Sequence, residues 1–234
     1  MSNFDKNIKI YNASAISEGK DVVLTQSDRT SVRYKFVNNA LVAPDVIRDK
    51  ILLQNNKYIV YRDDDNSIET YGIDGKLEKI VDRGGLSTIL TYDSPAASSA
   101  EASSRKLIKI LDPFGFLLKL TYDNSNRLNQ LILPDGNIIK YSYEEQISLS
   151  TNIKNGQLTS ITRQDGTTKR YFYEYVYAQP FFNNSLLTGI ENELGQRVSI
   201  YSYDNTGGVS TSQRGDATYM FSPWSYAPLA TMVN

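Results

Sequence analysis

Residues 105–144, RKLIKILDPFGFLLKLTYDNSNRLNQLILPDGNIIKYSYE, decide the fold because they contain one pattern of spacing twice. In each copy a leucine is followed three residues later by isoleucine or leucine, eight later by glycine and fifteen later by tyrosine. The copies are Leu107, Ile110, Gly115 and Tyr122, and then Leu128, Leu131, Gly136 and Tyr143. Apolar and polar residues alternate before each tyrosine, which is typical of a half-buried strand. Because the central glycine supplies the positive φ of a tight turn, each copy predicts a β-hairpin.

Three further copies keep these intervals, and the last is one residue longer between its glycine and its tyrosine. They are Leu77, Ile80, Gly85 and Tyr92; Leu158, Ile161, Gly166 and Tyr173; and Leu187, Ile190, Gly195 and Tyr203. The extra residue predicts a β-bulge in the last copy. A degenerate sixth copy runs from Val209 through Gly215 to Phe221. A repeat of fixed length predicts an array of stacked units that bury a core only together.

The tyrosine is followed by aspartate in three copies, at Asp93, Asp123 and Asp204. The turns read Asp82-Arg83-Gly84-Gly85, Asp112-Pro113-Phe114-Gly115 and Pro134-Asp135-Gly136. Over roughly residues 57–221 this pattern resembles the Rhs/YD-repeat family. The resemblance implies a ribbon of β-strands that spirals into a hollow shell. In bacterial polymorphic toxins and insecticidal toxin complexes the shell encloses a toxic C-terminal segment, and in teneurins a related shell serves cell-surface adhesion.

Rhs toxins also carry a self-cleaving aspartyl-protease signature near the end of the shell, with Asp-Pro-x-Gly-Leu at the toxin junction. This signature is missing here. The sequence that comes closest, DPFGF at 112–116, occupies an ordinary repeat position and ends in phenylalanine. The departure argues against cleavage by this polypeptide, and no catalytic residue is predicted.

The predicted fold is all-β, with tandem antiparallel β-hairpins in one continuous, curved and open sheet, because hairpin units cannot form parallel pairs. Three segments are expected within one continuous domain: a leading hairpin segment over 1–56, the repeat array over 57–221 and an irregular tail over 222–234. The first of these contains two β-type runs, at 21–25 and 31–37. The tail contains Pro223 and Pro228, which a central strand would not tolerate.

Three connections interrupt the expected array: 94–104, 145–155 and 174–185. The first is rich in alanine and serine, which predicts a surface loop. The third contains four aromatic residues between Tyr175 and Phe182. Since exposed aromatic groups are costly, this connection is expected either to fold over the sheet or to contact a partner.

Composition excludes several kinds of chemistry. The chain has neither cysteine nor histidine, so it can form no disulfide, thiolate nucleophile, imidazole metal site or Ser-His-Asp triad. The 25 basic and 26 acidic residues nearly cancel and are scattered, which argues against nucleic-acid binding. The chain shows no secretory signal and no run of about 18 apolar residues, so no membrane span is predicted. No cofactor and no metal are expected.

Three sets of residues are compatible with chemistry, and each has a structural explanation. Residues 63–66 (DDDN) offer oxygen ligands for calcium, yet they lie where a hairpin must turn. A glycosidase needs two carboxylates, but Glu144 and Glu174 occupy the aspartate position of the repeat. The repeated tyrosines form either a platform for sugars or packed core. The further acidic candidates are Glu145, Glu191 and Glu193.

The function predicted is that of a structural repeat protein, a segment of a shell that encloses a toxic cargo. The alternative is an adhesion module that binds carbohydrate or a cell-surface protein. Expected partners are further repeats, the cargo of the same system, or another copy joined through open sheet edges. In a toxin system such a chain, made in the cytoplasm, is expected to be secreted or displayed by a non-Sec route.

Strand arithmetic predicts that the chain alone cannot enclose a folded domain. Five units with leading and trailing hairpins give about 12 to 14 strands, a ribbon roughly 60 to 65 Å wide. Closed into a ring, this ribbon would be about 20 Å across, whereas a compact 100-residue domain is about 33 Å across. An open sheet is therefore expected.

Overall fold

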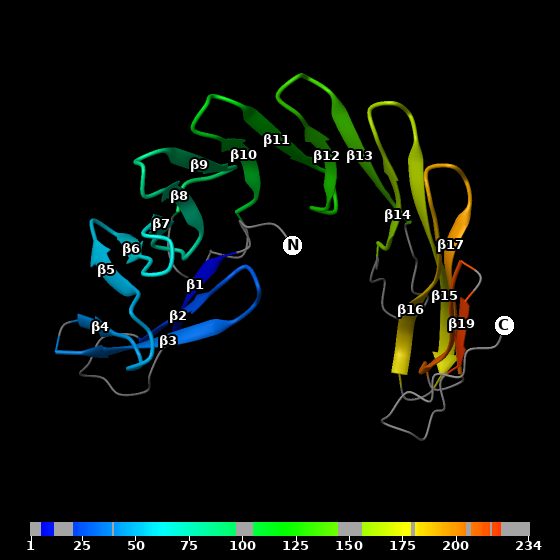
Figure 1. Ribbon diagram of the computed structural model, residues 1–234, viewed down its shortest axis with the longest axis horizontal. Helices are drawn as coiled ribbons and strands as arrows, with labels where there is room; N and C mark the ends of the chain where they lie inside the picture. Colours follow the sequence, from blue (N-terminus) through cyan, green and yellow to red (C-terminus); the bar gives the residue numbers. More distant parts are fainter. Residues whose placement is uncertain are drawn as a thin grey trace. The chain divides into compact units, whose positions relative to one another are not determined.

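The structure is a computed structural model of the 234-residue chain, drawn in Figure 1. It describes residues 6–11, 21–38, 40–96, 105–144, 156–178, 181–204, 207–215 and 217–220. These residues form nineteen strands and no helix, and the strand pairs with a defined register are antiparallel. None of the described residues belongs to a helix that could cross a membrane. The all-β class and the antiparallel pairing are confirmed.

The chain divides into two compact units, residues 1–120 and 121–234, with the boundary inside β11. Unit 1 holds a four-stranded sheet followed by the first strands of a hairpin sheet, and both follow chain order. The four-stranded sheet consists of β1 (Asn7–Tyr11), β2 (Asp21–Thr25), β3 (Ser31–Val37) and β4 (Ala40–Val42). The hairpin strands are β5 (Lys50–Gln54), β6 (Lys57–Tyr61), β7 (Ile68–Gly72), β8 (Leu77–Val81), β9 (Ser87–Tyr92), β10 (Leu107–Leu111) and β11 (Leu117–Tyr122).

Unit 2 continues the same succession of hairpins in chain order. Its strands are β12 (Leu128–Ile132), β13 (Ile138–Tyr143), β14 (Leu158–Thr162), β15 (Thr168–Ala178), β16 (Phe181–Glu191), β17 (Arg197–Tyr203), β18 (Val209–Arg214) and β19 (Ala217–Met220). Neither unit closes on itself, because the order of strands ends at β5 in unit 1 and at β19 in unit 2. The prediction of an open sheet is therefore confirmed.

All five predicted copies are hairpins, namely β8–β9, β10–β11, β12–β13, β14–β15 and β16–β17. The degenerate sixth copy is also a hairpin, β18–β19, with Gly215 between its strands. The predicted bulge lies in β17, where Ile190 faces Ser199 and Glu191 faces Arg197, which leaves Val198 unpaired. These features were predictable because each depends on a few neighbouring residues.

The core of unit 1 lies between its two sheets. Buried side chains from the four-stranded sheet meet buried side chains from β5 to β9, and the cluster consists of Ile8, Val22, Leu24, Tyr34, Ile51, Tyr58, Val60, Tyr71, Leu77 and Leu90. Figure 1 shows β1 to β3 beside the hairpins that contain β7 and β8. Period-2 alternation directs one face of each strand into this core.

Strand β1 also contacts the turn between β7 and β8 directly. The N–H of Ile8 donates to the carbonyl of Gly75 at 2.9 Å, and Asn7 forms a β-bridge with Lys76. Gly75 has φ +80, and a Cβ built on it would lie 1.8 Å from the Ile8 carbonyl oxygen. This contact therefore requires glycine, both for the backbone angle and for space.

Two expectations about strands are wrong. The connection expected over 174–185 is mostly strand, because β15 and β16 extend past the usual repeat length and pair as far as Ala178 with Phe181. The count of about 12 to 14 strands was also too low. The hairpin expected over 21–37 is present as β2–β3, but β1, β4 and β5 were not recognised in the leading segment.

The predicted division at 56/57 and 221/222 stays a prediction. Residues 97–104, 145–155 and 221–234, which contain most of the first two connections and the tail, lie outside the described residues.

Candidate functional site

The glycines of the repeat form the tips of the hairpins. At Gly166, for example, the Arg163 N–H donates to Thr167 O at 2.9 Å and the Gly166 N–H donates to Arg163 O at 3.0 Å. This is a three-residue loop that ends in a residue with positive φ. The angle is +84 at Gly85, +89 at Gly115, +85 at Gly136, +81 at Gly166 and +75 at Gly195. No atom lies within 4 Å of a Cβ built at these positions, so the backbone angle alone explains glycine there.

The tyrosine of the repeat bonds to the leucine of the same copy. We call this bond, from the tyrosine hydroxyl to the leucine carbonyl, the tyrosine tie. It is seen for Tyr92 and Leu77 at 2.7 Å, Tyr143 and Leu128 at 2.7 Å, Tyr173 and Leu158 at 2.9 Å, and Tyr203 and Leu187 at 2.6 Å. The tie joins the two strands at the open end of the hairpin, opposite the glycine tip. It gives the fifteen-residue interval a structural reason.

Loss of one tie should weaken the fold measurably. We expect Tyr173→Phe to lower the free energy of unfolding by about 1 kcal/mol, since the carbonyl of Leu158 loses a neutral hydrogen bond. Tyr171→Phe is the matched control, because the Tyr171 hydroxyl forms no hydrogen bond with the described residues. Urea denaturation of both variants measures the difference, and equal losses would show that the tie contributes nothing.

The aspartate after the tyrosine caps the connection to the next hairpin. Asp123 Oδ1 accepts from the N–H groups of Ser125 and Arg127, both at 2.9 Å. Burial raises the pKa of Asp123, but these donors and the Arg127 guanidinium outweigh it and hold the pKa below its usual value. Asp93 accepts from the Lys106 N–H at 2.9 Å, across the 94–105 connection. The aspartate at this repeat position therefore closes connections of different lengths.

Acid should remove the capping bonds of the turns. Hydrogen bonds from Asn137 hold the pKa of Asp135 low, and those from Thr167 do the same for Asp165. A depressed folded-state pKa contributes stability above the unfolded value of 3.8, and this contribution is lost as pH falls through the folded-state pKa. We expect the melting temperature to fall below about pH 4, and to fall less steeply in Asp165→Asn, whose amide oxygen still accepts. Identical profiles would contradict the capping role.

Arginines cover two of the repeated tyrosines. The Arg105 guanidinium lies 4.6 Å from the centre of the Tyr92 ring, and that of Arg127 lies 4.7 Å from the Tyr143 ring. Burial is the main cause that raises the pKa of Tyr143 and of Tyr173. At Tyr92 and Tyr143, one ring face on which a sugar could stack therefore carries a cation.

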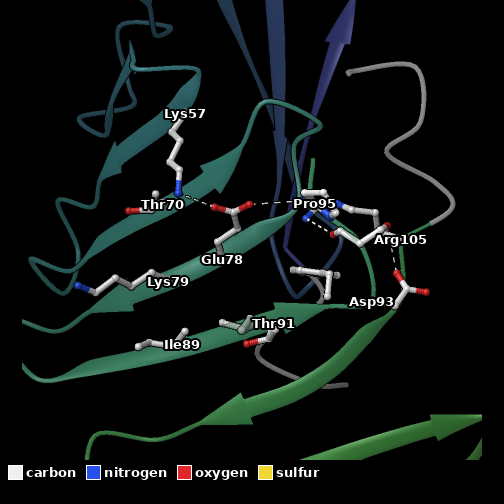
Figure 2. Close-up of a pocket in the computed structure, with 12 residues that line it drawn as sticks. Lys57, Thr70, Glu78, Lys79, Ile89, Thr91, Asp93, Pro95 and Arg105 are labelled. Carbon is white, nitrogen blue, oxygen red and sulfur yellow. Dashed lines mark hydrogen bonds and ion pairs between the residues drawn. The ribbon is translucent and has the colours of Figure 1, made fainter. Parts of the chain in front are cut away.

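A cavity of about 510 Å³ lies beside the first copy in unit 1, and Figure 2 shows its lining. Arg105 lines this cavity, is 7% exposed, and donates to Asp74 through Nε and through Nη2, the latter at 2.6 Å. Glu78 accepts from Lys57 at 2.9 Å and lies 3.7 Å from the Arg105 guanidinium. These charged groups thus pair with one another. Their ion pairs connect β8 to the segment before β10, which indicates a structural role for the cavity lining.

A second charged network lies inside the core of unit 1. Glu69 is fully buried, accepts from the Tyr71 hydroxyl at 2.7 Å and pairs with Lys6. Arg62 pairs with Asp49 at 2.7 Å. Burial raises the pKa of Tyr71, and burial raises that of Tyr34 to about 12. Sequence reasoning missed this network, because its partners lie up to 63 positions apart and share no motif.

The other acidic candidates have structural partners. Residues 63–65 form the turn between β6 and β7, where Asp65 Oδ1 accepts from the Ser67 N–H at 2.9 Å. Glu191 pairs with Arg170 at 2.6 Å, and Glu193 pairs with Arg163 at 3.1 Å. Within the described ranges no three acidic side chains form a group suited to a metal ion. Glu144 and Glu174 are exposed, and Glu145 lies outside the described residues.

No family model matches the chain, and no curated protein matches it. Among solved structures it is similar to a porin-like protein from Bacteroides uniformis, at 12% identity and a TM-score of 0.35, over 99% of this chain and 95% of that chain. It is also similar to a chain of TcdB2-TccC3-TEV, at 10% identity and a TM-score of 0.33, over 97% of this chain and 15% of that chain.

A chain of TcdB2-TccC3-Cdc42 gives 12% identity and a TM-score of 0.22 over the same shares of both chains. The chain therefore spans about a seventh of the TcdB2-TccC3 chains that it matches.

Proposed function

We propose that the chain is a structural repeat protein and not an enzyme. In this proposal it forms a wall segment of a Rhs/YD-type β-shell that encloses the toxic cargo of a bacterial system. The tyrosine tie is the observation that carries the proposal. The residues that define the repeat hold the hairpins together, at each tip through glycine and, in the four copies named above, at the open end through tyrosine and leucine. A sequence pattern whose residues hold the hairpins together has a structural role.

The repeat leucine is buried to different degrees in different copies, and this supports a wall whose apolar face is partly open to other polypeptide. In unit 1, Leu77 of the first copy is fully buried beneath the four-stranded sheet. The same position in unit 2, at Leu128 and Leu158, is only half-buried. Among the described side chains the buried apolar core ends at Ile110. Unit 2 therefore offers an apolar repeat face against which enclosed polypeptide could pack.

Protease protection tests the wall function. The chain is expressed together with the reading frames that flank it in its source genome, and the purified material is treated with protease before and after mild denaturation. We expect a co-encoded polypeptide that is protected while the β-structure is intact and is degraded once it opens. Degradation of every co-encoded polypeptide at the same rate in both states would refute enclosure. Release of the assembly without a Sec signal is part of the same proposal and is measured by fractionation.

An adhesion module that binds carbohydrate is the second candidate, and a particular set of side chains favours it. Tyr141, Tyr171 and Tyr201 each lie two positions before a tying tyrosine, so they share its face of the strand, and each is half-buried. No hydrogen bond of their hydroxyls is recorded among the described residues. Half-exposed tyrosines repeated along one face suit stacking on sugars. A glycan array tests this: binding that Tyr141→Ala and Tyr201→Ala abolish would support adhesion, and an array without signal would refute it.

A further inference from the structure

Two neighbouring hairpin tips in unit 1 expose large apolar side chains. Phe114 is 74% exposed and Phe116 is 59% exposed at the tip of β10–β11, and Leu86 is exposed at the tip of β8–β9. Behind the tips, Ile89 and Leu111 face each other across β9 and β10 and are exposed as well. We call these five residues the apolar tip patch. Single exposed apolar residues are ordinary, but a group gathered around two adjacent hairpin tips marks an interaction surface.

Lysines stand behind the apolar tip patch, on the face of the sheet that carries Ile89 and Leu111. Alternation directs Leu86 and Phe116 toward the opposite face, so the patch surrounds the two tips. Lys109 and Lys119 lie two positions further from the tips than Leu111 and Leu117, and they face each other across β10 and β11. Lys79 faces Ile89 across β8 and β9. Like charges directly opposite each other destabilise a sheet. Within the described part of the chain none of these three lysines pairs with a carboxylate, so an anionic partner would relieve their repulsion.

The aspartates that begin the two tips are already engaged in the turns. Asp82 Oδ1 accepts from the N–H groups of Gly84 and Leu86, at 2.8 and 2.9 Å. Asp112 Oδ1 accepts in the same way from Phe114 and Phe116, at 2.9 and 2.8 Å. These bonds fix the tips rigidly, so the phenylalanines are presented on a preformed loop.

The distances along the strands fit a lipid surface better than an acidic protein. Lys119 lies three positions further along the strand than Phe116, about 10 Å, and a lysine side chain can reach back toward the tip. Apolar side chains of interfacial proteins enter about 5 to 10 Å into the boundary between headgroups and acyl chains. Phosphates would then lie at the height of the lysines. An acidic protein would pair with the lysines, but it would need a separate pocket for two protruding phenylalanines.

We propose that the tips of the β8–β9 and β10–β11 hairpins bind an anionic membrane surface. The apolar tip patch enters the headgroup region, and Lys79, Lys109 and Lys119 bind lipid phosphates. This activity goes beyond the proposed wall function, which requires neither exposed phenylalanines nor unpaired lysines. It is peripheral binding by strands and loops.

Vesicle co-sedimentation of the full chain tests the proposal. We expect sedimentation with vesicles of phosphatidylcholine mixed with phosphatidylserine, none with phosphatidylcholine alone, and release as salt rises. The double variant Phe114→Ser/Phe116→Ser should bind at least about ten-fold more weakly. Each of Lys109→Gln and Lys119→Gln should weaken binding roughly five-fold. All four positions are exposed, so unchanged circular dichroism and melting will show that these variants fold.

Two matched controls should bind like the unaltered chain. Leu194→Ser changes an 81% exposed residue at the tip of β16–β17 in unit 2, and Lys35→Gln removes an exposed charge from β3. Absence of sedimentation with both kinds of vesicle would overturn the proposal. Equal losses in the tip variants and the controls would overturn it too. Binding to polyglutamate but not to vesicles, with the same lysine dependence, would replace the membrane with an acidic protein partner.

Discussion

Gly75→Ala is expected to lower the free energy of unfolding of unit 1 by at least about 3 kcal/mol, because strain and steric overlap add at this position. The added Cβ would lie 1.8 Å from the backbone oxygen of Ile8, which belongs to the strand that docks the four-stranded sheet. Alanine would also have to adopt a φ of +80. Relief of the overlap must move β1, and this breaks the hydrogen bond from Ile8 to Gly75.

Gly136→Ala is the matched control for this effect. Gly136 has a nearly identical φ of +85, but no atom lies within 4 Å of its added Cβ. Only the backbone penalty remains, about 1 to 2 kcal/mol. Urea denaturation of the two variants separates the contributions. If both lose the same stability, the contact between β1 and the β7–β8 turn does not hold the sheets together.

Leu77→Ala should cost about 2 to 5 kcal/mol, because Leu77 is fully buried between the two sheets of unit 1 and its removal leaves a cavity. Leu158→Ala changes the same position of another copy, where the side chain is only half-buried. Its loss should be smaller, roughly 1 to 2 kcal/mol, since less apolar surface returns to water. Denaturation of both variants measures the difference. Equal costs would mean that the repeat face is covered to the same degree in both units.

The local features of the fold were predictable from the sequence. Alternation before Tyr122 and Tyr143 identified strands, and a glycine eight residues after the leucine identified the tip that needs positive φ. The extra residue before Tyr203 correctly indicated a bulge. Each of these inferences depends on neighbours within one hairpin, and the backbone geometry of a hairpin is fixed locally.

Features that depend on distant partners were not predictable. Glu69 looks like an ordinary polar strand residue, yet it is buried and pairs with Lys6, 63 positions away. The regular repeat also misled at residues 174–185, because a fixed unit length suggested that the strands stop where β15 and β16 in fact continue. The interval between leucine and tyrosine was visible, but the bond that explains it required the hairpin in three dimensions.

The site interpretations divide in the same way. The turn at residues 63–66 was anticipated because aspartate and asparagine favour turns. The capping role of the aspartate after the tyrosine was not anticipated. Asp93 and Lys106 are separated by a long connection, and nothing in its sequence indicates that its two ends meet. The apolar tip patch was also missed, because Phe114 and Phe116 read as part of the repeat.

Hydrogen exchange of the intact chain, read by mass spectrometry, tests the central claim that the repeat is covered by the four-stranded sheet at β7 to β9 and is less covered at β12 to β14. The hydrogen-bond ladders are alike in both units, so differences in exchange report the packing on the face. We predict that the amides of β7 to β9 exchange most slowly and that those of β12 to β14 exchange clearly faster. Equal protection of the two groups, or slower exchange in β12 to β14, would contradict the account.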